Sequence, residues 1–582
     1  FEAALNAGDT AGAVSLFDRE CFWRDLLAFT WNVVTLEGRE AMSAMLDAQL
    51  AGSLPIALAL DEEPTVTDEI TEAWFKLETR VGRGRGHLRL KNGRCWTLLT
   101  TIDELKGHEE RRGTSRVQGV EHRARKNRVT WLEEQASERE ELGYSRQPYC
   151  VIVGGGQGGI MLGARLRKLG VPAIILEKNE RAGDSWRKRY RSLVLHDPVW
   201  YDHLPYLPFP DGWPVFTPKD KMGDWLEMYA RIMELNYWAS AECTGARFDA
   251  ATRKWTVAVS REGQELDLHP DQLVFATGAY GFAKIIDFPG AADFAGETLH
   301  TSEYQDGALY RGKRCAVIGS GSSAHDVCVD LWENDAEVTM IQRSPSIVAR
   351  SETLMKFAFA DLYSEEAVAR GITTDKADLL FASVPFRLMP QFQRPLYAEI
   401  READKAFYQR LTDAGFLWDF GVDDTGLMMK ALRTASGYYI DVGASELIIE
   451  GKVQVKGGVE IERMDTGGIC MADGTHIDAD VIIHATGYGS MDEMVAHLIS
   501  PSVAEKVGRF WGYGSGIEGD PGPWEGELRN MWKPTRQEAL WFHGGNLHLS
   551  RHYSLVVALQ IKARMSGIAT PVYPDVTASP GN

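Results

Sequence analysis

Short apolar runs alternate with helix-like segments from residue 148 onward. The apolar runs are "YCVIV", "AIILE", "LVFATG", "RCAVIG", "EVTMI" and "VIIHATGY". Residues 160–169 and 324–333 between them have the apolar spacing of helices. Buried runs of four to eight residues that alternate with helices are typical of parallel sheets with helices on their faces. This part of the chain is therefore predicted to be α/β.

The first 110 residues have a different texture. "FEAALNAGDTAGAVSLF" has helical spacing, and "GHLRLKNGRCWTLLTTIDEL" indicates two strands joined through Asn92-Gly93. This dipeptide favours tight hairpin turns because both residues accept a positive φ. We expect a small α+β unit here, followed by a polar linker over residues 111–147.

The composition of the chain argues against several classes of function. The formal net charge is −19, which argues against nucleic acid as the main partner because phosphate contacts need a broad basic surface. No stretch reaches the roughly 18 apolar residues of a membrane span. Seven scattered cysteines, none in a C-x-x-C pair, fit a reducing compartment. We expect a cytoplasmic protein without a membrane or nucleic-acid partner, without a metal and without a dithiol redox centre.

The motif "VIVGGGQGG" gives G-x-G-x-x-G on Gly154, Gly156 and Gly159, after an apolar strand and before a helix. Such glycines turn the chain tightly and let its amides and the helix N-terminus approach a pyrophosphate. Glu177 stands 23 residues after Gly154, at the end of the next strand. A carboxylate at this place accepts hydrogen bonds from ribose hydroxyls. The segment predicts a dinucleotide site.

The motif "AVIGSGSSAHD" repeats the arrangement with Gly319, Gly321 and Ala324. The same count of 23 residues reaches Gln342, which is followed by Arg343 and Ser344. A guanidinium holds a 2′-phosphate that a carboxylate would repel. The pair of sites therefore predicts FAD in the first and NADPH in the second, with electrons passing from NADPH to the flavin.

An ordered set of motifs resembles the class B flavin-dependent monooxygenases over residues 148–570. The motifs are "GGGQGG", "LEKNERAGDSWRKRY", "LPFP", "FATG", "FAGETLHTSEY", "GSGSSAHD", "QRS" and "HATGY". In "FAGETLHTSEY" the fingerprint of this group ends in "SEYQDG", whereas Baeyer–Villiger members usually carry Trp followed by Pro or Asp. This ending looks more like the plant-type YUCCA enzymes and related N- or S-oxidising enzymes.

The resemblance implies roles for single residues. His300 occupies the fingerprint histidine, which the family links to catalysis and domain movement, although a structural histidine is the simpler alternative. His196-Asp197 stands near the place where the family has a flavin-facing asparagine. Which polar side chain faces the flavin in this chain is therefore left open. The expected cofactor-binding residues are Gly154, Gly156, Gly158, Gly159, Glu177, Lys178, Gly183, Trp186, Cys243, Thr277, Gly278, Gly319, Gly321, Ser322, Ser323, Arg343, Ser344, Thr486, Gly487 and Leu547.

The N-terminal segment resembles a SnoaL-type cone through "ALNAGDTAGAVSLF", "CFWRDLLAFTWN" and "TLEGREAM". Such cones host catalysis, bind small molecules or dimerise, so a homodimer is open. "WRD", from Trp23 to Asp25, suggests an acid–base pair, and a structural ion pair at the mouth of the cone is the better interpretation.

The resemblance implies an NADPH- and FAD-dependent monooxygenase that uses O2 and a C4a-(hydro)peroxyflavin to insert one oxygen into a small organic substrate. N- or S-oxidation, or keto-acid oxidation of the indole-3-pyruvate type, is expected. A Baeyer–Villiger monooxygenase and an uncoupled NADPH oxidase that makes hydrogen peroxide are alternatives. A disulfide reductase would need a cysteine pair, and two intact nucleotide motifs argue against a non-catalytic sensor.

The expected domains follow from these assignments. They are an α+β unit (1–110), a linker (111–147), the FAD-binding domain in two parts (148–300 and 481–582), the NADPH-binding domain in two parts (301–349 and 441–480), and a helical insertion or substrate lid (350–440).

Overall fold

Two five-stranded parallel sheets form the framework of the protein in the computed structural model, which describes residues 1–120, 122–278 and 282–576. The first sheet has the order β11-β10-β9-β15-β27, and the second has the order β16-β26-β17-β18-β22. The first comprises Cys150–Val153 (β9), Ala173–Leu176 (β10), Tyr237–Trp238 (β11), Gln272–Phe275 (β15) and Leu540–Phe542 (β27). The second comprises Glu297–His300 (β16), Arg314–Ile318 (β17), Glu337–Gln342 (β18), Val453–Gly457 (β22) and Val481–His484 (β26).

The second sheet repeats the first, strand for strand. In each, a central strand leads through a glycine turn and a helix to its parallel neighbour: β9 through α5 (Gln157–Lys168) to β10, and β17 through α9 (Ser322–Glu333) to β18. Each also carries a three-stranded antiparallel sheet. These are Ala241–Asp249 (β12), Lys254–Arg261 (β13) and Gln264–Leu268 (β14), and Ile461–Asp465 (β23), Gly468–Met471 (β24) and His476–Asp478 (β25). The internal duplication is thus wider than the two glycine motifs.

One expected domain boundary is wrong. Residues 481–484 were assigned to the FAD-binding domain, but β26 pairs in parallel with β16 and β17 inside the second sheet. The strand β16, placed at the end of the first domain, also belongs to the second sheet. Local apolar runs reveal the strands, but they carry no information about which sheet each strand joins.

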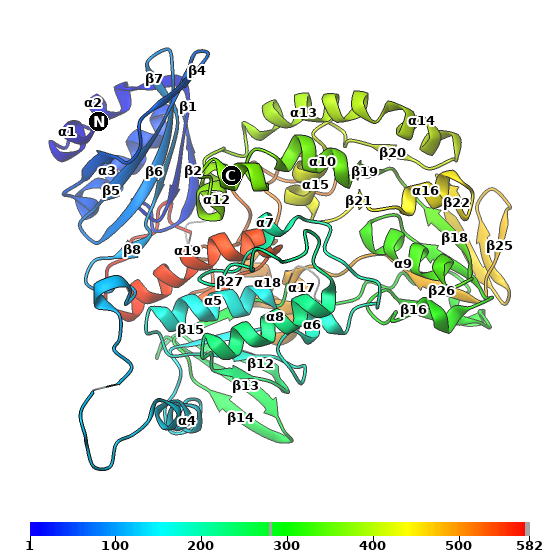
Figure 1. The fold of residues 1–582 in the computed structure, drawn as a ribbon, viewed down its shortest axis with the longest axis horizontal. Helices are drawn as coiled ribbons and strands as arrows, with labels where there is room; N and C mark the ends of the chain where they lie inside the picture. Colours follow the sequence, from blue (N-terminus) through cyan, green and yellow to red (C-terminus); the bar gives the residue numbers. More distant parts are fainter. Residues whose placement is uncertain (121, 279–281, 577–582) are drawn as a thin grey trace.

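Helix α19 (Leu547–Met565) lies beside α5 and runs beneath the N-terminal unit (Figure 1). Its residues are buried around the whole circumference, including His548, Arg551 and Gln560. A helix buried on all faces lies inside a protein and not at its surface. Together with α8 (Lys219–Ile232), these helices build the main core.

The region between the halves of the second sheet is mostly helical. It contains α10 (Ser351–Leu354), a π-helical turn (Met355–Phe359), α11 (Glu365–Ala369), α12 (Thr374–Ala382), α13 (Met389–Ala403), α14 (Lys405–Asp413), α15 (Gly426–Thr434) and α16 (Ala444–Ile449). A small parallel sheet of order β20-β19-β21 anchors it, formed by Ser346–Arg350 (β19), Trp418–Asp419 (β20) and Tyr438–Asp441 (β21). Short helices fill the remaining connections: α6 (Asp184–Arg187), α7 (Val199–Asp202), α17 (Met491–Leu498) and α18 (Pro501–Val507).

The N-terminal unit is a curved sheet of order β2-β1-β7-β6-β5-β3 with three helices. Its elements are α1 (Glu2–Asn6), α2 (Thr10–Ser15), β1 (Phe17–Leu26), β2 (Val33–Glu37), α3 (Gly38–Ser53), β3 (Ala57–Leu60), β4 (Thr65–Thr67), β5 (Ile70–Glu78), β6 (Gly82–Lys91), β7 (Arg94–Thr101) and β8 (Glu104–Leu105). Asn92 and Gly93 join β6 to β7 with φ of +52° and +73°, which confirms the predicted turn.

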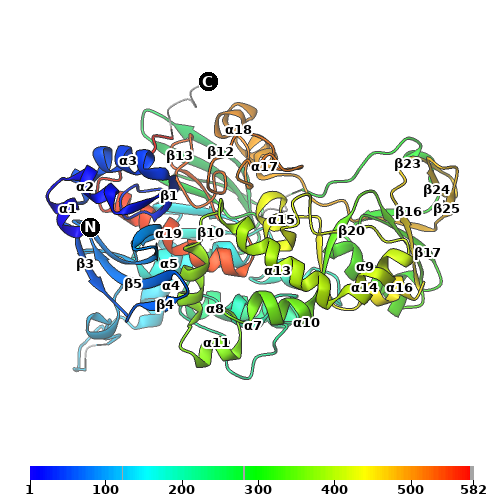
Figure 2. The same ribbon diagram turned by 90° about the horizontal axis from the view of Figure 1, so that it is seen from above.

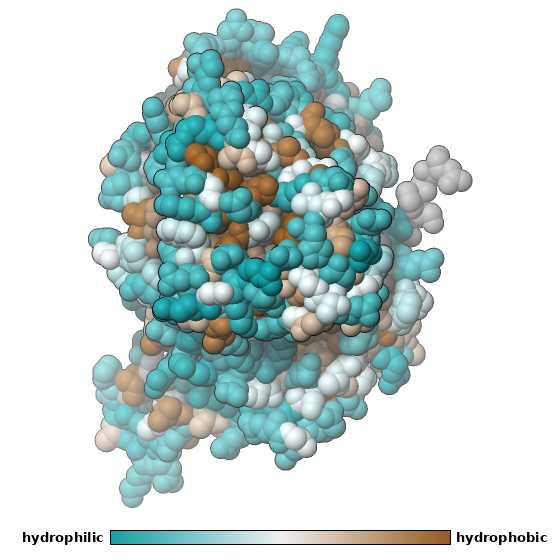
Figure 3. Space-filling view, turned by 90° about the vertical axis from the view of Figure 1, so that its right-hand side faces the viewer, coloured by the Kyte–Doolittle hydropathy of each residue, from teal (hydrophilic) through white to brown (hydrophobic). Residues whose placement is uncertain are grey.

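The three bodies lie in a row, with the first nucleotide unit between the N-terminal unit and the second nucleotide unit (Figure 2). The linker contains the 3-10 turn Gly113–Ser115 and the α-helix α4 (Trp131–Glu141). Seen from the end of the second nucleotide unit, most side chains are hydrophilic and apolar ones gather near the middle of the face (Figure 3). Within the described ranges, no helix combines the length and the apolar character that crossing a bilayer requires.

Candidate functional site: two glycine turns and the crossings between them

The three glycines of the first turn have different tasks. Gly154 has φ +107°, and a Cβ there would meet the carbonyl oxygen of Ala276 at 2.5 Å. A Cβ on Gly159 would lie 1.9 Å from the carbonyl oxygen of Gly154. Around Gly156, by contrast, the nearest atom is 3.6 Å from such a Cβ. Packing within the protein therefore requires the outer two glycines, whereas the middle one leaves space that a ligand can use.

The second turn divides its tasks in the same way. Gly319 has φ +130°, and its Cβ would meet the carbonyl oxygen of Ala485 at 2.4 Å. Gly321 is open, with the nearest atom at 3.8 Å, and Ala324 is buried in the third position. Ala276 and Ala485 are equivalent residues, because each precedes a Thr-Gly pair at the end of the strand beside the central one.

Both helices that follow the turns begin without a side-chain cap. Gly156 and Gly321 are the N-cap residues of α5 and α9, and neither provides an oxygen for the first amides. Uncapped amides and the positive end of the helix dipole together form an anion site. The residues present therefore fit the pyrophosphate of a dinucleotide at each turn.

The residue after the first strand, Glu177, is an acid whose side chain is held in place by hydrogen bonds. Glu177 is buried, and its carboxylate accepts from the amide of Gly155 at 2.9 Å and from the amide and side chain of Asn179 at 2.8 and 2.7 Å. These bonds hold the carboxylate against the glycine turn, where a ribose lies in proteins of this fold class.

The second strand end differs in a way that the sequence did not show. The amide of Gln342 is fully buried and pairs with the backbone of Leu417, donating at 2.7 Å and accepting at 2.8 Å. Gln342 therefore ties β18 to the helical insertion. Arg343 and Ser344 are exposed beyond it, and within the described chain Arg343 has no ion pair. Gln342 thus takes the place that Glu177 has in the first unit, and the exposed cation of Arg343 follows it by one residue.

The two Thr-Gly segments mark the crossings between the nucleotide units. Gly278 and Gly487 both have φ +81°. The Oγ1 atom of Thr277 is buried and lacks a hydrogen-bond partner within the described residues, whereas the hydroxyl of Thr486 donates to the carbonyl of Lys284. The crossings also pair with each other, because Ala283 and Tyr488 form an antiparallel bridge. An orphaned hydroxyl beside Gly154 suits a ligand at the first turn.

His300 is held at this junction by both ring nitrogens. Its Nε2 lies 3.0 Å from the carbonyl oxygen of Gly487, so Nε2 carries the proton and donates. Its Nδ1 accepts from the amide of Ser302 at 3.1 Å. Burial lowers the pKa of this imidazole. A neutral histidine with both ring nitrogens in hydrogen bonds holds the crossing in position. The geometry leaves neither nitrogen free for acid–base catalysis.

His196 and Asp197 face different parts of the protein. The His196 ring is 3.4 Å from the carboxylate of Asp326 on α9, and its pKa is raised because this partner outweighs burial. Burial raises the pKa of Asp197 to about 6, with the charge of His196 opposing the shift. Of the two, His196 therefore contacts the helix that follows the second glycine turn.

A cluster near the start of α19 was not anticipated. Tyr201 stacks on His548 with 4.6 Å between ring centroids, and Tyr201 accepts a hydrogen bond from Asn546, the N-cap of α19, at 3.2 Å. Asp202 is buried with both oxygens unpartnered in the described chain. Burial and the nearby Asp197 raise its pKa well above the usual range. These residues are far apart in sequence and belong to no motif.

The remaining expected residues have varied surroundings. Gly183 has φ +87° and packs against the backbone of Gly223 on α8. The hydroxyl of Ser322 donates to the carbonyl of Tyr438 at 3.0 Å. Gly158 lies against Gly544, which precedes α19, and Leu547 is the buried first residue of that helix. Lys178 is exposed, Trp186 and Ser323 are half-buried, and Cys243 is buried in β12, where burial raises its pKa to about 11.

The expected ion pair within "WRD" is wrong. Arg24 and Asp25 point to opposite faces of β1, as neighbours in a strand do. Asp25 is bound by the hydroxyls of Thr30 and Thr100 at 2.6 and 2.5 Å. Arg24 instead crosses to the C-terminal part of the chain, where it pairs with Glu527 at 2.7 Å and donates to the Tyr553 hydroxyl on α19 at 2.8 Å.

Beside this contact lies a cavity of about 400 Å³ between the N-terminal unit and helices α5, α12 and α19. Polar side chains from both sides line it, among them Arg85, Asp103, Arg165, Asp378, Arg551 and His552. The N-terminal unit thus encloses polar space against the helix that starts at the first glycine turn.

Fold and site together define a protein with two dinucleotide-binding units. A family model described as pyridine nucleotide-disulphide oxidoreductase matches residues 151–381. Indole-3-pyruvate monooxygenase YUCCA1 of Oryza sativa subsp. japonica is 33% identical over 346 residues, which cover 59% of this chain and 77% of that protein.

Two solved structures share the fold at 18% identity. A cyclohexanone monooxygenase bound to epsilon-caprolactone has a TM-score of 0.51 and covers 72% of this chain and 88% of its own. OTEMO in complex with FAD and NADP has a TM-score of 0.50, and the match covers 73% of this chain and 86% of OTEMO. The chain belongs to the class B flavin-dependent monooxygenases, the family that includes the YUCCA enzymes, which confirms the resemblance seen in its motifs.

Proposed function

We propose that this enzyme uses NADPH and FAD to insert one oxygen atom of O2 into a small organic substrate, with FAD at the first glycine turn and NADPH at the second. One observation carries the assignment. The two units are duplicates, yet the strand after the first turn leads to the buried carboxylate of Glu177, whereas the strand after the second ends on neutral Gln342 and is followed by the exposed cation of Arg343. A free guanidinium suits a 2′-phosphate, and a carboxylate suits free ribose hydroxyls.

FAD, once bound and reduced by NADPH, supplies the activation of O2, and the second oxygen atom leaves as water. The protein's own residues then have positioning tasks. The uncapped amides of α5 and α9 hold the pyrophosphates, and Glu177 and Arg343 orient the sugars. His300, fixed between Ser302 and Gly487, keeps the two crossings in place.

For the substrate we propose an aromatic keto acid, the class named for the rice relative. The cluster near the start of α19 supports this choice. Tyr201, Tyr363 and His548 contact one another with 4.6 to 5.7 Å between ring centroids, and Phe381 contacts His548 at 5.1 Å. Aromatic side chains pack favourably against aromatic rings, so this cluster suits an aromatic substrate better than an aliphatic one.

The assignment of NADPH is tested with Arg343→Ala. The variant should retain FAD, lose most of its preference for NADPH over NADH and show an increased KM for NADPH. Arg311→Ala, which removes an exposed arginine at the other end of the second sheet, is the matched control and should keep the preference. An unchanged preference in Arg343→Ala would remove Arg343 from the phosphate site.

The assignment of oxygenation is tested by comparing product formed with NADPH consumed for an aryl-pyruvate, an amine, a sulfide and a ketone. Turnover of the aryl-pyruvate with little hydrogen peroxide supports the proposal. Turnover of the ketone alone would favour Baeyer–Villiger chemistry. Hydrogen peroxide equal to the NADPH consumed, with every substrate, would indicate an oxidase.

We further infer that the N-terminal unit is a SnoaL-type cone, supported by its curved sheet packed on α3. The protein is proposed to work in the cytoplasm, in keeping with its seven unpaired cysteines. A homodimer through the N-terminal unit is tested by the solution mass of the full chain.

A further inference from the structure

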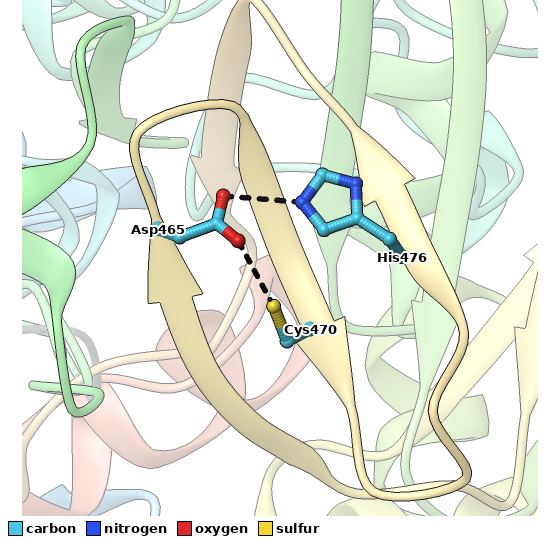
Figure 4. A group of neighbouring side chains, drawn as sticks. All are labelled: Asp465, Cys470 and His476. Atoms are coloured by element: carbon cyan, nitrogen blue, oxygen red, sulfur yellow. Dashed lines mark hydrogen bonds and ion pairs between the residues drawn. The ribbon is translucent and has the colours of Figure 1, made fainter.

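In the small sheet β23-β24-β25 of the second nucleotide unit, three side chains of metal-ligand type, one from each strand, lie together. These are Asp465, Cys470 and His476, which point toward one another (Figure 4). Cys470 and His476 are directly opposite in the antiparallel pair β24-β25, and Asp465 ends the neighbouring strand at its turn. Three strands of a rigid sheet therefore aim a carboxylate, a thiol and an imidazole at one point.

The distances suit a shared cation. Asp465 Oδ1 lies 3.1 Å from His476 Nε2, and Asp465 Oδ2 lies 3.1 Å from Cys470 Sγ. One ligand atom from each residue lies within 4.8 Å of the other two, and no second such trio occurs in the described part of the chain. Ligands of a tetrahedral zinc ion at about 2.0 to 2.3 Å from the metal need roughly this separation.

The second ring nitrogen of His476 has the surroundings of a metal-binding histidine. The other ring nitrogen of His476, Nδ1, lies 2.9 Å from Asp478 Oδ1. Metal-binding histidines commonly donate their second N–H to a carboxylate, which fixes the ring orientation and strengthens the ligand. Asp478 is itself held by Arg314 on β17 at 3.1 Å. The imidazole is thus oriented from behind by a carboxylate that is anchored to the second sheet.

We propose that Asp465, Cys470 and His476 form a site for a divalent cation of the zinc type, with solvent at the fourth position. Asp465 is 33% and His476 38% exposed, so a cation has access and a water ligand has room. Binding of one cation displaces two protons, one from the Cys470 thiol and one from the imidazolium at Nε2. The carboxylate of Asp465 exchanges its two hydrogen bonds for a bond to the metal.

Arg463 distinguishes this site from a mere surface network of charges. Its Nη1 lies 3.5 Å from Asp465 Oδ2 and competes with a cation for that carboxylate. Removing this positive charge should strengthen metal binding, whereas it would weaken a network held by Arg463. The site lies on the sheet that branches from the second unit and not at a glycine turn, so we expect the metal to stabilise β23-β24-β25 without altering NADPH affinity.

The test is titration of the full-length, chelator-stripped, reduced protein with Co²⁺, followed by displacement with Zn²⁺. A thiolate-to-cobalt charge-transfer band should appear, because Cys470 is the one cysteine among the described residues that is not buried. The band should vanish in Cys470→Ser and in His476→Gln. Asp478→Asn should weaken binding about 10- to 100-fold, and Arg463→Gln should tighten it.

Asp473→Asn is the matched control, since this acid lies at the turn before β25 and pairs with Lys456. It should bind Co²⁺ like the parent protein. Absence of the charge-transfer band at excess Co²⁺, or its persistence in Cys470→Ser, would overturn the proposal. Melting curves of each variant without metal show whether the variant folds.

Discussion

The buried contact between Arg24 and Glu527 connects the N-terminal unit to the monooxygenase region, and its removal gives the sharpest test of how these bodies depend on each other. Both side chains are 2% exposed. The guanidinium makes two bonds of 2.7 Å to the carboxylate, one of 2.8 Å to the carbonyl of Ala382 and one of 2.8 Å to the Tyr553 hydroxyl. It also lies 5.1 Å from the ring of Phe386.

Arg24→Met keeps the apolar stem and removes all four bonds. It leaves the Glu527 carboxylate buried with the hydroxyl of Thr35, at 2.7 Å, as a remaining partner. Breaking a buried pair in this way costs about 3–5 kcal/mol, because one charge stays uncompensated. The double variant Arg24→Met/Glu527→Leu removes both charges of the pair and should lose less stability than Arg24→Met alone.

Urea unfolding followed by tryptophan fluorescence, together with limited proteolysis, measures the effect. We expect Arg24→Met to unfold at lower urea than the parent protein and to be cleaved within the N-terminal unit before the main transition. Lys376→Met is the control, because the Lys376–Glu62 pair bridges the same bodies but is 25% and 48% exposed. Its loss should cost at most about 1 kcal/mol. Equal effects of the buried and the exposed pair would refute the reasoning.

Three further predictions concern the glycine turn and the buried carboxyls. Gly154→Ala should destabilise the protein, because its methyl group meets a carbonyl oxygen at 2.5 Å in a backbone of positive φ. Gly156→Ala should have the melting temperature of the parent protein but bind FAD weakly. Equal FAD affinity in Gly156→Ala and the parent would contradict the proposed approach of the pyrophosphate. Since folding raises the pKa of Asp197 from 3.8 to about 6, the native state holds an extra proton between these values, and stability should fall as the pH rises through that window. Asp197→Asn should flatten this dependence in melting curves, and an unchanged slope would assign it elsewhere. His300→Ala, which removes the bond from Nε2 to Gly487, should lower kcat more than it changes FAD affinity, and an unchanged kcat would show that this bond has no part in turnover.

The parts of the site that sequence reasoning located are local. A glycine turn lies between its own strand and helix, so the spacing of Gly154, Gly156 and Gly159 was sufficient to predict it. A fixed count of 23 residues also reaches Glu177 in the first unit and Gln342, directly before Arg343, in the second. The role of Gln342 was missed, because its partner Leu417 belongs to a separate segment.

Long-range contacts carried no local signal. Arg24 and Glu527 are 503 residues apart, and an arginine in "WRD" gives no sign that it leaves its own unit. The place of β26 in the second sheet and the meeting of Tyr201 with His548 depend in the same way on chain topology. Side-chain type and spacing predict which residues can bind, and tertiary packing decides which of them meet.

The two crossings between the nucleotide units have a mechanical consequence. They run antiparallel and bond to each other through Ala283 and Tyr488, with further backbone bonds from Lys284 to Gly487 at 3.0 Å and from Gly489 to Phe282 at 2.8 Å. A two-stranded ribbon bends readily across its thin direction but resists stretching and shear. We therefore expect the two nucleotide units to rotate relative to each other about one axis that passes through the crossings. His300, which bonds one crossing, should set the orientation of the units at rest.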